Sequence, residues 1–134
     1  MAKIADIEGI GPAYAEKLQK AGVRSVEALL KRAAGAKGRK ELSEATGIDS
    51  TLILKWANMA DLFRIKGVAA QFSELLEAAG VDTIKELRTR NAENLYAKVK
   101  EVNDAKKKVR QIPSLKQIQG FIDQAKTMEP SISH

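Results

Sequence analysis

The chain has 134 residues and a formal net charge of +6, from 23 Lys and Arg against 17 Asp and Glu. A chain of this length buries roughly two-thirds of its unfolded surface, so it supports a core without metals or disulfides. It contains no cysteine. This excludes a disulfide scaffold, a cysteine nucleophile, an iron–sulfur cluster and thiolate zinc sites, and it fits a reducing compartment.

The remaining composition narrows the chemistry further. The single histidine is the last residue, His134, so neither a Ser-His-Asp triad nor a histidine metal cluster is expected within one subunit. The longest unbroken apolar runs have three residues, as in Leu52-Ile53-Leu54, so no membrane span is expected. We therefore expect a cytoplasmic protein that is not an enzyme, with no cofactor, no metal, no small-molecule substrate and no membrane partner.

Residues 7–29 align without a gap with residues 65–87, which indicates an internal duplication. The aligned positions include Gly9 with Gly67, Tyr14 with Phe72, and Gly22 with Gly80. We expect one domain over residues 1–134, with internal repeats 4–64 and 65–128 and a flexible tail 129–134.

The first repeat is predicted to be a series of helices. Pro12 suits the first helical position and Gly22 a left-handed helix end, while Ser25 is a candidate cap for a second helix ending near Gly35. A short helix is expected from Lys40 to Ala45. After a cap at Asp49 or Ser50, a helix over about 51–63 is apolar almost all round, so it should be the central buried helix.

The second repeat predicts the same order, with helices over 70–79, 83–88, 92–107 and 114–128. No segment alternates apolar and polar residues with β-branched enrichment, so no sheet is expected. The predicted fold class is all-α: two tandem repeats packed as one compact helical domain, with the helix around Trp56 between them.

The turn before Pro12 is a candidate anion site. Gly9 and Gly11 allow positive φ and place no side chain before an approaching ligand, and the following helix presents unpaired amides and its positive dipole end. The alternative is a tight connection between packed helices, with Ile7 and Ile10 as core anchors.

With Ala15, Leu18 and Gly22 after this turn, both copies resemble the helix-hairpin-helix motif, which binds the phosphate backbone of DNA. The wider arrangement is similar to an uncharacterised bacterial family of unknown function with helix-hairpin-helix repeats. The second copy has Ala69 and Ala70 where the first has Gly11 and Pro12. The expected phosphate contacts are Gly9, Ile10, Gly11, Lys17, Lys66, Gly67 and Val68.

Two basic stretches contain no acid and form a candidate supporting patch. Its residues are Lys37, Arg39, Lys40, Lys106, Lys107, Lys108 and Arg110. The alternative is that these cations are solvated helix ends that complement helix dipoles. Trp56, Phe63 and Phe72 lie at apolar positions, so no exposed stacking platform for single strands is expected.

Together these features predict a non-catalytic protein that binds duplex DNA without sequence preference, through turn amides and Lys/Arg side chains on phosphates. The alternative is a protein-protein interaction or assembly module that retains the fold without binding DNA.

Overall fold

The computed structural model describes residues 3–7, 9–68, 70–107, 109–129 and 131–132. Throughout these residues the regular structure is helical, and extended pairing is confined to one antiparallel bridge between Lys3 and Ser25. The predicted all-α class is confirmed. By contact density the chain divides into unit 1, residues 3–61 with 131–132, and unit 2, residues 62–129. Ile132, in the segment predicted to be a flexible tail, is buried.

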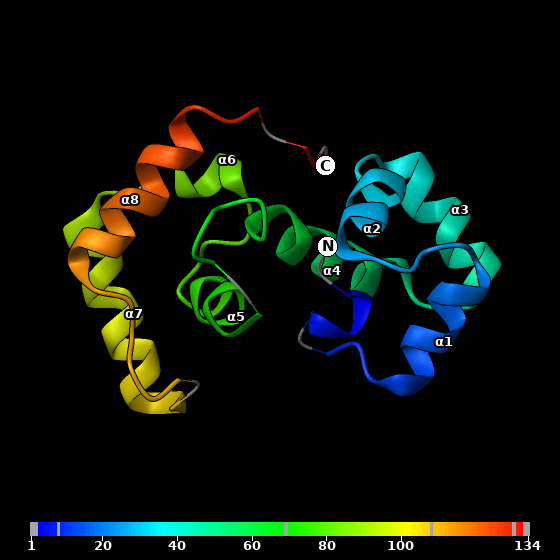
Figure 1. Cartoon of the computed structure of the whole chain (residues 1–134), viewed down its shortest axis with the longest axis horizontal. Helices are drawn as coiled ribbons and strands as arrows, with labels where there is room; N and C mark the ends of the chain where they lie inside the picture. Colours follow the sequence, from blue (N-terminus) through cyan, green and yellow to red (C-terminus); the bar gives the residue numbers. More distant parts are fainter. Residues whose placement is uncertain (1–2, 8, 69, 108, 130, 133–134) are drawn as a thin grey trace. The chain divides into compact units, whose positions relative to one another are not determined.

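Unit 1 follows the predicted order of helices (Figure 1). Its elements are the 3-10 turn η1 (Ile4–Asp6), α1 (Pro12–Lys20), α2 (Val26–Ala33), α3 (Ala36–Thr46) and α4 (Ser50–Leu62), whose last residue begins unit 2. The Ser25 hydroxyl accepts from the Ala28 amide at 3.0 Å and caps α2. An Asp49 carboxylate oxygen accepts from the Thr51 amide at 2.8 Å at the start of α4.

The corner between α2 and α3 differs from the prediction, because α3 begins at Ala36 and not at Lys40. Gly38 packs so tightly on α2 that an added Cβ would lie 2.1 Å from the Arg32 carbonyl oxygen. The buried Arg39 guanidinium donates to the carbonyls of Ala33 and Ala34 at 2.9 and 3.0 Å. A side chain of α3 therefore completes the end of α2, next to the close contact between Gly38 and the Arg32 carbonyl.

Unit 2 repeats the order with helices close to the predicted ranges. They are α5 (Ala70–Ala78), α6 (Ile84–Leu87), α7 (Ala92–Lys106) and α8 (Leu115–Lys126). Helix α7 packs against α5 and α8, and α6 packs against α8 (Figure 1). The core contains buried apolar side chains from all four helices, among them Leu75, Leu76, Ile84, Leu87, Leu95, Val99, Ile118 and Ile122.

The aligned segments share their local geometry. The amide of Val23 donates to the Leu18 carbonyl at 2.8 Å, and the amide of Val81 donates to the Leu76 carbonyl at the same distance. Both bonds close the end of the preceding helix in the Schellman pattern. The Thr83 hydroxyl accepts from the Glu86 amide at 3.2 Å and so caps α6 as Ser25 caps α2.

Helix α4 is largely buried, as its composition predicts. Trp56 is 1% exposed and its ring centroid lies 5.1 Å from that of Tyr14, at an interplanar angle of 62°. This edge-to-face arrangement holds the first turn of α1 against α4 within unit 1.

We predict that Trp56→Ala lowers the free energy of unfolding by about 3 to 5 kcal/mol, because it removes a fully buried large side chain and leaves a cavity. Chemical denaturation of the variant and the wild type measures the difference. An unchanged denaturation midpoint would contradict burial of the indole.

We predict that replacement by alanine has opposite effects on stability at two helical glycines, Gly38 and Gly120. Gly38→Ala should destabilise by about 1 to 3 kcal/mol or more, since the new methyl group would overlap the Arg32 backbone. Gly120→Ala should stabilise by about 0.5 to 1 kcal/mol, because nothing lies within 4 Å of an added Cβ in that helix. Thermal unfolding of both variants tests the pair, and equal shifts would show that the α2–α3 corner is looser than described.

Candidate phosphate-binding site

The first candidate turn lies between η1 and α1. Gly9 has a φ of +96°, and the Ile10 amide donates to the Ile7 carbonyl at 3.1 Å. Ile10 is buried, so its side chain anchors the turn and its N–H is already occupied. Gly9 and Gly11 are exposed. Gly9, Ile10 and Gly11 are all predicted from the sequence to present amides to an anion. The amide of Ile10 instead bonds within the turn, so this residue has a structural role.

Gly11 is the open position of this turn. It is the N-cap of α1, with extended backbone at φ −82° and ψ −178°, and an added Cβ would meet no atom within 4 Å. Pro12 occupies the first helical position. The next two amides, those of Ala13 and Tyr14, lie in the first turn of α1, where main-chain donors have no partner within the helix. An anion in front of Gly11 would meet these donors and the positive end of the helix dipole.

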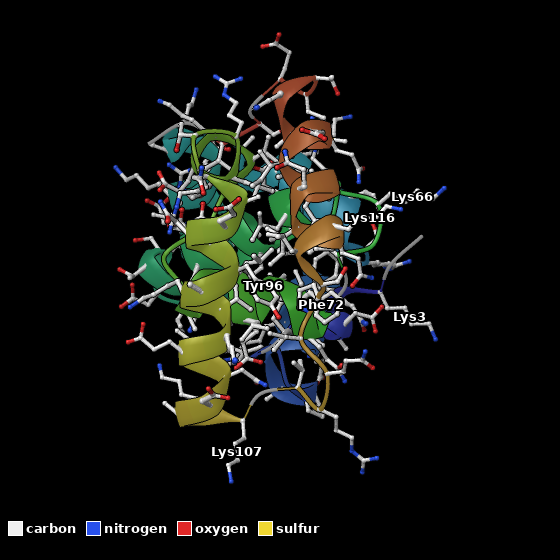
Figure 2. The ribbon with its side chains drawn as sticks, turned by 90° about the vertical axis from the view of Figure 1, so that its left-hand side faces the viewer. Lys3, Lys66, Phe72, Tyr96, Lys107 and Lys116 are labelled. Atoms are coloured by element: carbon white, nitrogen blue, oxygen red, sulfur yellow. The ribbon has the colours of Figure 1, made fainter. Side chains whose placement is uncertain are left out.

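The second candidate turn is tied to α8. Gly67 has a φ of +98°, and the Val68 amide donates to the Ile65 carbonyl at 3.1 Å, as in the first turn. The Gln124 side chain accepts from the Lys66 amide at 2.9 Å and donates to the Lys66 carbonyl at 3.0 Å. Both main-chain groups of Lys66 and the amide of buried Val68 thus have partners within the protein. What this turn presents outward is the exposed Lys66 side chain, which projects away from the helices in Figure 2.

Both turns place a glycine against an aromatic ring of their own unit. A Cβ added to Gly9 would lie 3.3 Å from Nε1 of Trp56, and one added to Gly67 would lie 3.0 Å from Cε1 of Phe121. Positive φ and close packing together account for glycine at these two positions without any ligand. Gly11 has neither constraint, so packing does not explain its lack of a side chain.

The predicted cations lie at different places in the two units. Lys17 is exposed in the last turn of α1, more than one helical turn beyond the glycines. Lys37 and Lys40 are exposed on α3, whereas Arg39 is buried and bonded to the end of α2. The structure thus corrects the assignment of Arg39 to a surface patch.

The second basic stretch lies at the end of α7. Lys106, Lys107 and Arg110 are exposed, and Lys108 lies outside the described residues. Lys107 ends the helix in a left-handed conformation with a φ of +51°, and its amide donates to the Asn103 carbonyl at 2.7 Å.

An open hollow in unit 2 brings part of this stretch to the first turn of α5. We call it the α7–α8 hollow; its lining includes Gln71, Phe72, Asn103, Lys107, Arg110 and Gln111. Phe72 is predicted from the sequence to lie at an apolar position, whereas no feature of the sequence points to Gln71 or Asn103. Phe72 is only half-buried, and its ring centroid lies 6.4 Å from that of Phe121. No sequence signal could have revealed the hollow, because the connection after α7 creates it.

The described residues contain no group of three or more His, Cys, Asp or Glu side chains placed to hold a metal ion. Nor does any helix within that part of the chain have the length and apolar character needed to cross a membrane.

Among known proteins, the chain matches one family. No curated protein matches the chain, and no solved structure matches it either. A family model, described as a domain of unknown function and designated DUF4332, matches residues 8–128. Since this match spans most of the 134 residues and both candidate turns from Gly9 onward, the chain belongs to the DUF4332 family.

Proposed function

We propose that the protein consists of two helix-hairpin-helix-type repeats and binds duplex DNA through phosphates, without catalysis and without sequence preference. The repeat assignment is supported by the shared turn geometry at Gly9 and Gly67, by the matching helix ends after Leu18 and Leu76, and by the equivalent caps.

The observation that carries the proposal is the open space in front of Gly11. An N-cap with extended backbone and no side chain leaves the start of a nine-residue helix accessible to an anion. Main-chain donors of this kind contact phosphate and carry no base information, so binding would depend on charge and salt more than on sequence.

The two turns contribute unequally in this proposal. The first offers main-chain donors at α1, while the second is bonded to Gln124 and adds the Lys66 side chain as a point charge. Lys17 adds a longer-range attraction from the other end of α1.

We predict duplex binding in the non-specific range, with a dissociation constant on the order of 1 to 100 µM at physiological salt. Affinity should fall steeply between about 50 mM and about 200 mM salt and should barely differ between unrelated duplex sequences. Fluorescence anisotropy with labelled duplexes measures both properties. Absence of salt-dependent binding at the lower concentration would remove DNA binding from consideration.

The amide site itself is tested by Gly11→Asp. Aspartate is a favoured N-cap, so this variant should be at least as stable as the wild type, yet its carboxylate would occupy the helix amides and repel phosphate. We expect weaker duplex binding and a salt slope lower by about one phosphate contact.

Two matched variants control this experiment. Gly11→Ala adds only a methyl group in open space and should bind more tightly than Gly11→Asp. Ala69→Asp places the same charge at the aligned position of the second repeat and should weaken binding less. Equal binding by Gly11→Asp and Gly11→Ala would show that phosphate does not contact the start of α1.

The second candidate function is a protein-interaction or assembly module. It is favoured by the internal bonding of the second turn, which leaves Lys66 no free main-chain group. It is also favoured by Leu115, a large apolar residue that is 42% exposed at the start of α8. In this case the glycines serve as turn formers, and the salt titration above would show no duplex binding.

A further inference from the structure

We infer that the α7–α8 hollow binds one unpaired nucleotide, so that the protein prefers a duplex with a single-stranded end to a blunt duplex. The inference rests on the proposed DNA binding and adds the class of DNA structure that this site would recognise.

The hollow is held in shape by the chain itself. The Asn103 side chain accepts from the Val109 amide and donates to the Val109 carbonyl, each at 3.0 Å. This two-bond clamp fastens the connection after α7 to the helix, and the left-handed Lys107 supplies the sharp turn between them. A site built in this way is already formed before a ligand arrives, which reduces the ordering cost of binding.

Its size and composition suit a nucleotide. The hollow has a volume of about 820 Å³, which falls within the range of small-ligand sites. The half-buried Phe72 ring and Val109 offer apolar surface to a base, on which aromatic stacking is independent of sequence. A phosphodiester backbone alone would gain nothing from these two side chains, whereas an unpaired base would.

The polar groups of the lining divide between the two parts of such a ligand. Lys107 and Arg110 supply positive charge for its phosphate, and Figure 2 shows Lys107 projecting from the end of α7 toward solvent. Gln71 and Gln111 provide amides, and Asp104 a carboxylate, that can hydrogen-bond to polar atoms of a base edge.

In its described part unit 1 has a smaller hollow of about 540 Å³ between α3 and the start of α4. Its lining includes Lys40 and Ser43 but no aromatic side chain. Helix α7 has 15 residues where α3 has 11, and α3 ends at Thr46, with Gly47 as its C-cap before Ile48 and Asp49. No cation stands in that connection. Among the described residues, the aromatic ring, the cations that follow the helix and the longer helix therefore occur together only in unit 2.

The test compares three labelled DNAs in anisotropy titrations with the full chain: a blunt duplex, the same duplex with a short single-stranded extension, and a longer blunt duplex with the same total number of phosphates. We expect the extended DNA to bind about fivefold or more tightly than either blunt DNA. Equal affinity for the extended and the longer blunt DNA would overturn the inference while leaving the proposed function in place.

Variants assign the preference to the hollow. Phe72→Leu, and Lys107→Gly combined with Arg110→Gln, should each reduce the preference to less than twofold; glycine at 107 keeps the left-handed helix end. The matched control combines Lys85→Gln with Lys100→Gln, which removes two exposed cations of unit 2 outside the lining and should keep the preference. A preference retained by the hollow variants would contradict the assignment.

A direct titration separates this inference from the proposed function. Nucleoside 5′-monophosphate should shift the amide resonances of Gln71, Phe72 and Gln111 in the wild type, and these shifts should vanish in the Lys107/Arg110 variant. If no DNA binds, the proposed function fails and so does the preference for extended DNA. The titration then tests nucleotide binding by the hollow: specific shifts support it, and absent shifts overturn it.

Discussion

The contact between a turn glycine and an aromatic ring organises each unit. A Cα with no side chain lies against Trp56 in unit 1 and against Phe121 in unit 2, and in both places φ is positive. Any larger residue would push the neighbouring ring by a few tenths of an ångström and would adopt a backbone conformation that L-residues rarely take. The contact sets the position of the turn relative to the last helix of the unit, and thereby the direction in which α1 or α5 begins.

The same contact leads to different surfaces in the two units. In unit 1 the backbone beyond Gly9 continues to Gly11, which meets no neighbouring atom, so the start of α1 stays open. In unit 2 the Gln124 side chain of α8 bonds both main-chain groups of Lys66 and closes the turn. Unit 2 instead has a hollow at the end of the longer α7, which polar and charged groups line. Under the proposed function, the two units would therefore offer different groups to an anion.

The basic residues show why charge runs need a structure before they can be interpreted. Arg39 stands between Lys37 and Lys40 in sequence, yet it is buried because the end of α2 needs donors for the carbonyls of Ala33 and Ala34. Its planar guanidinium reaches both carbonyls from one position. Arg110 belongs to a similar run but lines a hollow. One cation completes a helix end and the other remains available to a ligand, although their sequence surroundings are alike.

The sequence by itself determined the order of the helices and most of their ends, because these signals are local. Pro12, Ser25, Asp49 and Ser114 mark helix starts through backbone geometry and side-chain caps, and the Gly22 and Gly80 positions end helices in both repeats. Only the tertiary structure decided which of the candidate amides and side chains are exposed to a ligand and which are bonded or packed within the protein. The occupied amide of Ile10, the Gln124 bonds to Lys66, the early start of α3 and the half-buried ring of Phe72 all depend on residues distant in sequence or on the close approach of two helices. Residue spacing along one chain contains no information about such contacts, since the partner that satisfies a donor or covers a ring is brought there by packing.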